Sequence, residues 1–108
     1  MEVTGKETKM AINGTIKMTR PNTSTAWYVI PDNTKTYLKE NFIDTGKRTF
    51  DSETVSADGL VKTVTYTFTN QEAKNAWVAD STIQGHLNAR DTHNVTNKID
   101  LERAETDS

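Results

Sequence analysis

Two stretches of the chain alternate apolar and polar residues with the period of two that is typical of a β-strand. The first covers residues 11–20 and ends at Pro21, which has no backbone N–H to donate to a neighbouring strand. The second covers residues 47–69 and is divided by Ala57-Asp58-Gly59, a turn sequence between two extended runs. The pattern therefore predicts one strand and, later in the chain, a β-hairpin.

The length of the loop in this hairpin decides which side chains meet across it. A two-residue turn at Asp58-Gly59 would bring acidic residues onto the face that carries Phe68, whereas a three-residue loop with Gly59 left-handed pairs apolar residues with one another. We favour the three-residue loop for that reason. It pairs Phe50 with Tyr66 and Val55 with Val61. The core face is then Phe50, Val64, Tyr66 and Phe68, and the other face carries Thr63, Thr65, Thr67 and Thr69.

Helical patterns flank the hairpin on both sides. Pro31-Asp32-Asn33 offers a start for a helix that reaches about Ile43, and Gly46 supplies a left-handed stop after it. The segment Asn70–Ile99 is amphipathic but is interrupted at Asp80-Ser81, so we expect two helices in place of one. Its apolar spacing predicts buried positions at Ala73, Ala76, Trp77, Ile83, Leu87, Val95 and Ile99.

The length of the chain and its hydrophobic pattern together predict the number of domains and the fold class. With 108 residues the chain has the usual size of one domain, and its mixture of hairpin and helices gives the α+β class. We expect a single domain over residues 10–99, a flexible N-terminal arm over residues 1–9 and an acidic, frayed C-terminal tail over residues 100–108. Residues 22–31 are not assigned, beyond a buried irregular run at Ala26–Ile30.

Composition excludes several classes of function. The chain has no cysteine, which excludes disulfides, thiolate metal sites and thiol nucleophiles. Its formal net charge of -2 gives no electrostatic reason to bind nucleic acid. No apolar run is long enough for a signal peptide or a membrane span, so we expect a soluble, cytoplasmic protein. Apolar content of only 33% implies a thin core, and we expect a homodimer in which a second copy completes the burial.

Two groups of polar residues are candidates for chemistry. His86, Arg90 and His93 would project from the same side of one helix. Residues seven apart lie roughly 10 Å apart along the axis, whereas the ligands of one metal must come within about 2 Å of it. We therefore expect a solvated polar face there and no metal site. Asp51 and Glu53 share a strand face in the predicted hairpin, and we expect exposed charges there in preference to an acid–base pair.

One region of the chain resembles the strand-to-helix junction of the antibiotic-biosynthesis-monooxygenase-like domains, over Tyr66–Ala73, Trp77, Asp80 and His86-Leu87. The resemblance implies a ferredoxin-like antiparallel sheet with helices packed on one face, and a dimeric α+β barrel. Haem-degrading members of that group use an asparagine on the first strand with a tryptophan and a histidine on this helix. The nearest counterparts here are Asn13, Trp77 and His86, so the resemblance implies haem as the cofactor of such an enzyme.

The short sequence, rich in Thr, Asn and Asp, also resembles small uncharacterised proteins of tailed phages. That resemblance implies an accessory or assembly role, in the cytoplasm of a phage-infected host cell.

Our leading hypothesis is a self-associating, non-enzymatic binding or assembly domain that needs no cofactor. The subunit or ligand face would be Thr63, Thr65 and Thr67, because a stripe of β-branched residues is not optimised simply for water. His86 and Arg90 are further binding candidates. The alternative is a monooxygenase-like or haem-binding enzyme with Asn13, Trp77 and His86 as its catalytic candidates. A third hypothesis is a carrier of an unknown small molecule.

Overall fold

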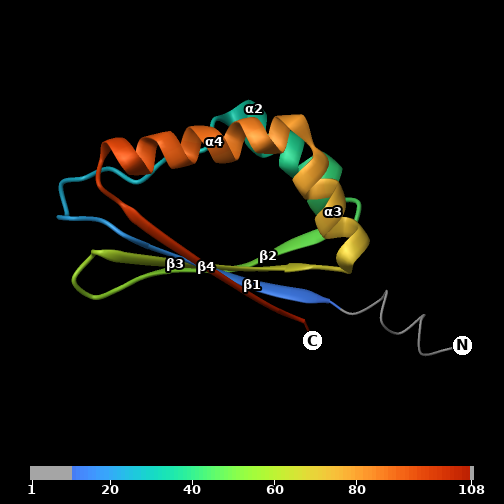
Figure 1. Ribbon diagram of the computed structural model, residues 1–108, viewed down its shortest axis with the longest axis horizontal. Coiled ribbons are helices and arrows are strands. Elements are labelled where there is room, and N and C mark those ends of the chain that lie inside the picture. Colours follow the sequence, from blue (N-terminus) through green and yellow to red (C-terminus); the bar gives the residue numbers. More distant parts are fainter. Residues whose placement is uncertain (1–10, 108) are drawn as a thin grey trace, which may run out of the picture.

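One antiparallel sheet with helices on a single face makes up the fold of the described chain (Figure 1). The computed structural model describes residues 11–107. In chain order the elements are β1 (Ile12–Thr19), α2 (Asp32–Leu38), the π-helix η1 (Lys39–Ile43), β2 (Arg48–Val55), β3 (Val61–Phe68), α3 (Gln71–Ala79), α4 (Ser81–Thr96) and β4 (Asp100–Asp107). The strands lie in the order β2-β3-β1-β4, and helices connect β1 to β2 and β3 to β4. This βαββαβ arrangement is the predicted ferredoxin-like α+β fold.

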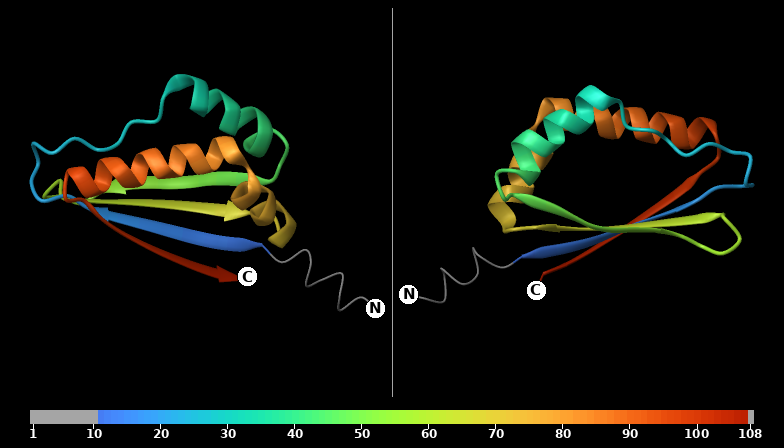
Figure 2. Two further views of the ribbon diagram at one scale, coloured as in Figure 1. Left: turned by 45° about the horizontal axis from the view of Figure 1, so that its top comes forward. Right: turned by 180° about the vertical axis from the view of Figure 1, so that it is seen from behind.

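The two faces of the sheet have different surroundings, as the views in Figure 2 show. Because side chains alternate along a strand, Ile12 and Ile16 of β1 point toward the helices and Thr15 points away. The face that points away carries Thr15, Thr49, Thr54, Thr63, Thr65 and Thr67. We call this surface the threonine face, and no helix of the described chain lies on it (Figure 2). Thr69, expected on the same face, follows the end of β3 and donates its hydroxyl to the Gly46 carbonyl.

The core lies between the helices and β1 and β3. Tyr66 and Phe68 are buried as predicted, together with Ile12 and Ala73, and Trp77 packs against them. Two predicted core positions are wrong: Phe50 is 55% exposed and Val95 is 79% exposed. Phe42, Ile83, Asn94 and Ile99 are also buried.

A β-bulge in β2 combines the two hairpin registers that the sequence offered. Phe50 lies opposite Tyr66 as predicted, but beyond the bulge Val55 lies opposite Lys62 and not Val61. The loop covers residues 56–60 and is therefore longer than either predicted turn. Gly59 adopts the expected left-handed conformation, with φ 78°. The bulge adds one residue to β2, so the pairing between β2 and β3 shifts by one residue partway along the hairpin. Neither predicted register includes such a shift.

The bulge also separates the two carboxylates of β2. Asp51 accepts hydrogen bonds from the hydroxyls of Thr49 at 2.6 Å and Thr67 at 2.5 Å, on the threonine face. Glu53 points to the helix side, where its carboxylate lies 3.7 Å from Lys62 Nζ. Asp51 and Glu53 therefore do not share a face, and the expectation that they do is wrong.

The C-terminal segment is a strand and not a frayed tail. Residues 100–107 form β4, which pairs antiparallel with β1 along its whole length. Intrinsic strand propensity is low in this acidic run, but β1 offers an unpaired side whose backbone groups need partners. The folded domain therefore extends to Asp107. The predicted N-terminal arm over residues 1–9 lies outside the described residues.

The two-piece helix is confirmed, with its break at the expected position, between Ala79 and Ser81. Asn70 begins α3 by accepting the Ala73 N–H at 2.8 Å. Asp80 caps α4 by accepting the Ile83 N–H at 3.0 Å. The Asp80 carboxylate also accepts the Tyr37 hydroxyl at 2.6 Å, which ties the break to α2.

Residues 20–31 are irregular, which confirms the irregular run expected at Ala26–Ile30, but they are only partly buried. Arg20 fixes this segment through hydrogen bonds to the Gly59 carbonyl at 2.8 Å and the Thr25 carbonyl at 2.7 Å. Its guanidinium also lies 4.7 Å from the centre of the Trp27 ring. Val29 is 77% exposed, so the apolar run is not a core element throughout. Among residues 11–107, no helix has the length and hydropathy needed to cross a membrane.

Candidate functional site

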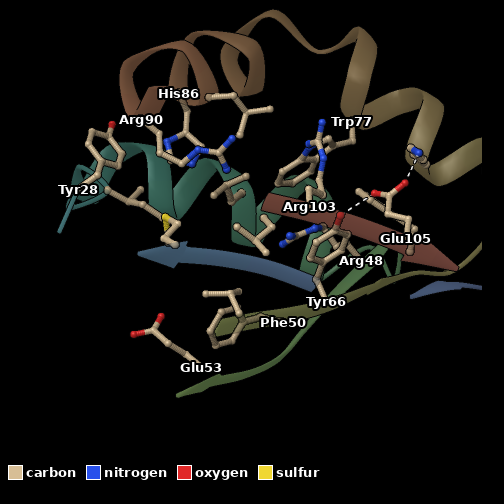
Figure 3. Close-up of a pocket in the computed structure, with 18 of the residues that line it drawn as sticks. Tyr28, Arg48, Phe50, Glu53, Tyr66, Trp77, His86, Arg90, Arg103 and Glu105 are labelled. Carbon is tan, nitrogen blue, oxygen red and sulfur yellow. Dashed lines mark hydrogen bonds and ion pairs between the residues drawn. The ribbon is translucent and has the colours of Figure 1, made fainter. Parts of the chain in front are cut away.

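A cavity of about 390 Å³ lies between the sheet and the helices (Figure 3). Ile16 and Val64 contribute to its lining from the sheet, and His86, Leu87 and Arg90 contribute from α4. In Figure 1, α3 slopes down toward the sheet while α4 runs above it, so the break at their junction sets the direction of α4. The volume is at the lower end of the range of about 300–1,000 Å³ that is usual for small-molecule sites.

The cavity opens to solvent beside β2. Phe50 lines the cavity and is also 55% exposed, and Glu53 lines it from the same strand. Figure 3 shows both side chains on one side of the cavity, away from the helices. The cavity is therefore accessible without movement of the helices.

Arg48 occupies an aromatic enclosure at one end of the cavity. Its guanidinium carbon lies 4.3 Å from the centre of the Trp77 ring, 4.5 Å from that of Tyr66 and 5.5 Å from that of Phe68. Burial lowers the pKa of Arg48 to about 10, so the side chain is still cationic at pH 7. Within the described residues, its Nε is enclosed and has no hydrogen-bond partner.

A chain of polar contacts lies beside this arginine. The Tyr66 hydroxyl donates to Glu105 at 2.6 Å, and Lys74 forms an ion pair with the same carboxylate (Figure 3). Burial and the Glu105 contact both raise the pKa of the Tyr66 hydroxyl above its usual value. Burial opposes ionisation of Glu105, but the hydrogen bonds from Lys74 and Tyr66 prevail and lower its pKa. The Glu105 charge is thus offset by Lys74.

His86 and Arg90 lie at the other end of the cavity, beside Tyr28 (Figure 3). The Tyr28 ring lies 5.7 Å from the His86 ring and 5.8 Å from the His93 ring. Burial, followed by the charges of Arg90 and Arg48, lowers the pKa of His86, so this imidazole is neutral at pH 7. Its Nδ1 is buried without a partner among the described residues. The expected solvated face is therefore wrong at His86 and Arg90, which face the cavity.

The cavity is cationic in a chain whose net charge is -2. Five of the described lining residues carry positive charge and only two are carboxylates: Arg48, Lys62, Lys74, Arg90 and Arg103 against Glu53 and Glu105. Apolar side chains supply most of the other lining. This combination favours a ligand with an apolar body and a negative charge.

The candidate residues from the sequence are divided between the two sides of the sheet. Trp77, His86 and Arg90 line the cavity. Asn13 lies on the opposite side, where its side-chain amide lies 3.1 Å from the Thr67 hydroxyl oxygen. The three threonines Thr63, Thr65 and Thr67 lie on the threonine face, as predicted.

The sequence reasoning missed Arg48, Arg103 and Glu105 as cavity residues. Arg48 had a usable signal, because it shares strand parity with Phe50 and so points a charge toward the predicted core. Arg103 and Glu105 had no such signal, because residues 100–108 were expected to form a frayed tail and not a strand.

Comparison with known proteins defines the fold and not a family. No protein-family model matches this chain, and no curated protein matches it. A conserved protein of unknown function from Bacteroides thetaiotaomicron, described as a possible oxidoreductase, superposes with a TM-score of 0.64 at 12% identity, over 93% of this chain and 99% of that chain. A dimeric ferredoxin-like protein from an uncultured marine organism gives 0.53 at 5% identity, over 92% and 95%. A protein from Shewanella oneidensis gives 0.50 at 14% identity, over 93% and 92%.

At these identities the similarity shows the fold alone, which is ferredoxin-like. None of the three matches is described as a phage protein, so the resemblance to phage proteins stays a prediction.

Haem, which the monooxygenase resemblance implies, does not fit this arrangement in full. Trp77 and His86 share the cavity, but Asn13 lies across the sheet from both of them. The three-residue set is therefore not assembled on one face, and we derive no chemical step through haem.

Proposed function

We propose that this protein is a non-enzymatic, small-molecule-binding domain whose ligand occupies the cavity between the sheet and α4. One observation supports the proposal above the others: two side chains at the cavity, Arg48 and His86, keep enclosed nitrogens with no partner in the described chain. Unpaired buried polar groups cost free energy, and sites that retain them are commonly completed by a ligand.

The location of the site is tested by blocking the cavity. Leu87→Trp enlarges a half-buried side chain on the cavity lining, whereas Val95→Trp makes a matched enlargement on the same helix at a position that is 79% exposed. Backbone amide NMR spectra are recorded with a library of charged and neutral fragments at millimolar concentration. We expect fragments to shift amides of the cavity residues in the wild type and in Val95→Trp, and to lose this effect in Leu87→Trp.

Two results would contradict the proposal. One is a wild-type spectrum in which no fragment shifts a cavity amide, and the other is binding that survives unchanged in Leu87→Trp. Thermal unfolding of both variants establishes that each is folded at the temperature of the experiment.

A second property, self-association through the threonine face, is supported by a separate observation. This face has the β-branched residues of a packed surface, including Thr65, whose hydroxyl bonds Ser52 at 2.5 Å, yet no helix of the described chain lies on it. One structural neighbour is described as a dimeric ferredoxin-like protein. We propose that a second copy of this chain occupies the face.

Light scattering behind a sizing column tests this arrangement. We expect a dimer at tens of micromolar, dissociation by Thr65→Lys at the centre of the face, and an unchanged dimer for Thr92→Lys on the exposed side of α4. A wild-type monomer at that concentration would rule the dimer out. The same result would leave the cavity proposal standing, because the cavity lies within one subunit.

The enzymatic alternative is separated from binding alone by a haem titration. A haem-binding enzyme would show a Soret shift at stoichiometric haem that is absent in His86→Ala. The binding function proposed here expects no such shift.

A further inference from the structure

We infer that the ligand of this cavity is a small carboxylic acid with an apolar body, and that Arg48 binds its carboxylate. The inference rests on the proposed function of the cavity and adds to it the chemical class of the ligand. The inference rests on the free donors of the guanidinium, on the absence of an ion pair to Arg48 among the described residues, and on the apolar lining.

The hydrogen-bond donors of Arg48 are not used by its aromatic neighbours. A guanidinium carries five N–H donors in its plane, and aromatic rings interact with its faces. Trp77 and Tyr66 therefore stabilise the charge, with ring centres within 4.5 Å, while the edge of the guanidinium keeps its donors. Its Nε is enclosed, but the terminal nitrogens are not, and Arg48 lines the cavity. A planar pair of N–H donors fits a carboxylate in bidentate geometry.

No carboxylate of the described chain forms an ion pair with Arg48. Glu105 is paired with Lys74 and also accepts the Tyr66 hydroxyl. Glu53 lies 3.7 Å from Lys62, and Asp51 is bound to threonine hydroxyls on the far side of the sheet. Asp51 and Glu105 favour the Arg48 charge without forming an ion pair with it, but burial is the larger effect and lowers its pKa, so an incoming anion would stabilise this cation further.

His86 does not supply the positive charge that an anionic ligand group needs. Its imidazole is neutral at pH 7, because burial and the neighbouring charges of Arg90 and Arg48 lower its pKa. A neutral imidazole offers a hydrogen bond but no charge. His86 is therefore left for an uncharged polar group of the ligand, and Arg48, a cavity-lining cation held between the Trp77 and Tyr66 rings, is the residue assigned to the anion.

The remaining lining limits the rest of the ligand to an apolar group of modest size. Ile16, Val64 and Leu87 lie along the cavity, and its volume is about 390 Å³. Three of the other lining cations are already paired with carboxylates, Lys62 with Glu53, Lys74 with Glu105 and Arg90 with Asp91, which disfavours a highly charged ligand such as a nucleotide. A monocarboxylate with a ring or a short branched chain matches both the charge and the walls.

Two matched probes test the assignment: phenylacetate, which carries the carboxylate, and phenylacetamide, which has nearly the same shape and no charge. Affinities are measured by titration calorimetry and by amide NMR shifts. We expect the wild type to bind phenylacetate roughly 10- to 100-fold more tightly, since a hydrogen-bonded charge pair out of water is worth that factor. Arg48→Met keeps an unbranched apolar stem against the rings and removes the fork, so the preference should disappear.

Lys35→Met is the matched control, because it removes an exposed cation on α2 that does not line the cavity and should leave the preference intact. If Arg48→Met does not fold, Arg48→Lys replaces it. Lysine keeps the charge without the planar fork, and we expect it to lose most of the preference.

The possible results separate this inference from the proposed function. Equal binding of the two probes by the wild type, or a carboxylate preference that survives in Arg48→Met, overturns the assignment while the cavity remains a ligand site. Failure of both probes while other fragments shift cavity amides also overturns it. Failure of every compound in the library overturns the proposed function as well.

Discussion

Substitution of Gly14 by alanine is expected to test how tightly the sheet packs beside the cavity. Gly14 on β1 lies opposite Tyr66 on β3 and Glu105 on β4. A Cβ atom added at Gly14 would collide with Cζ, Cε1 and the hydroxyl of Tyr66, because the tyrosine ring lies directly over the glycine. The alanine therefore fits only if the ring moves.

The expected loss of unfolding free energy in Gly14→Ala has two parts. Inserting a methyl group into a well-packed region costs about 1–3 kcal/mol of unfolding free energy. Displacing the Tyr66 ring also breaks its 2.6 Å hydrogen bond to the Glu105 carboxylate, and a bond to a charged group contributes about 1.5–3 kcal/mol. We expect a total loss of about 2.5–6 kcal/mol. For a domain of this size, that corresponds to a fall in Tm on the order of 10–20 °C.

Urea denaturation measures this loss, and Gly85→Ala on α4 is its matched control. Nothing lies within 4 Å of a Cβ added at Gly85, so the same change should stabilise the helix by about 0.5–1 kcal/mol. The Gly14→Ala variant should also cost less in a Tyr66→Leu background, where the ring is absent. The reasoning is refuted if Gly14→Ala is as stable as the wild type, or if its cost is the same with and without Tyr66.

Two further predictions concern the helices. Asp80→Ala should lower the free energy of unfolding by about 1–3 kcal/mol, because it removes both the α4 cap on Ile83 and the acceptor of the Tyr37 hydroxyl. Tyr37→Phe loses only the second bond and should cost less than Asp80→Ala; equal costs in chemical denaturation would contradict this division. Because burial and then nearby cations hold the pKa of His86 below 6.5, the unfolded chain binds this proton more readily. The free energy of unfolding should therefore fall as the pH decreases below about 6.5. His86→Gln should flatten the slope there, and an unchanged slope would exclude His86 as its source.

Local patterns account for most of the elements. The alternation over residues 11–20 predicted β1, and the polar break at Asp80 predicted two helices, because each depends on neighbouring residues alone. Gly46 and Gly59 both adopt the left-handed conformation expected of them. These features need no knowledge of distant contacts.

Features that depend on distant contacts could not be predicted in the same way. Strand β4 forms because its backbone pairs with β1, which is distant in the sequence. Its sequence does not show the apolar alternation of an ordinary strand, because Arg103 and Glu105 occupy inward positions. The bulge at Asp51 changes the register by one residue, and neither of the uniform ladders contains it. Arg48 was missed for a related reason. It is a charged residue at an inward strand position, where pattern analysis expects an apolar core residue, because it lines a cavity.

The bulge in β2 has a consequence for how copies of this chain can meet. β2 and β4 form the two borders of the sheet, and a border strand normally presents a regular row of unpaired backbone groups that invites another strand to add on. On β2 the irregularity at Asp51 interrupts that row. On β4 the charged residues, among them Glu102 and Arg103, discourage the approach of a second strand. Both borders thus oppose open-ended growth of the sheet into fibres, and they direct any pairing of subunits to a closed, face-to-face arrangement.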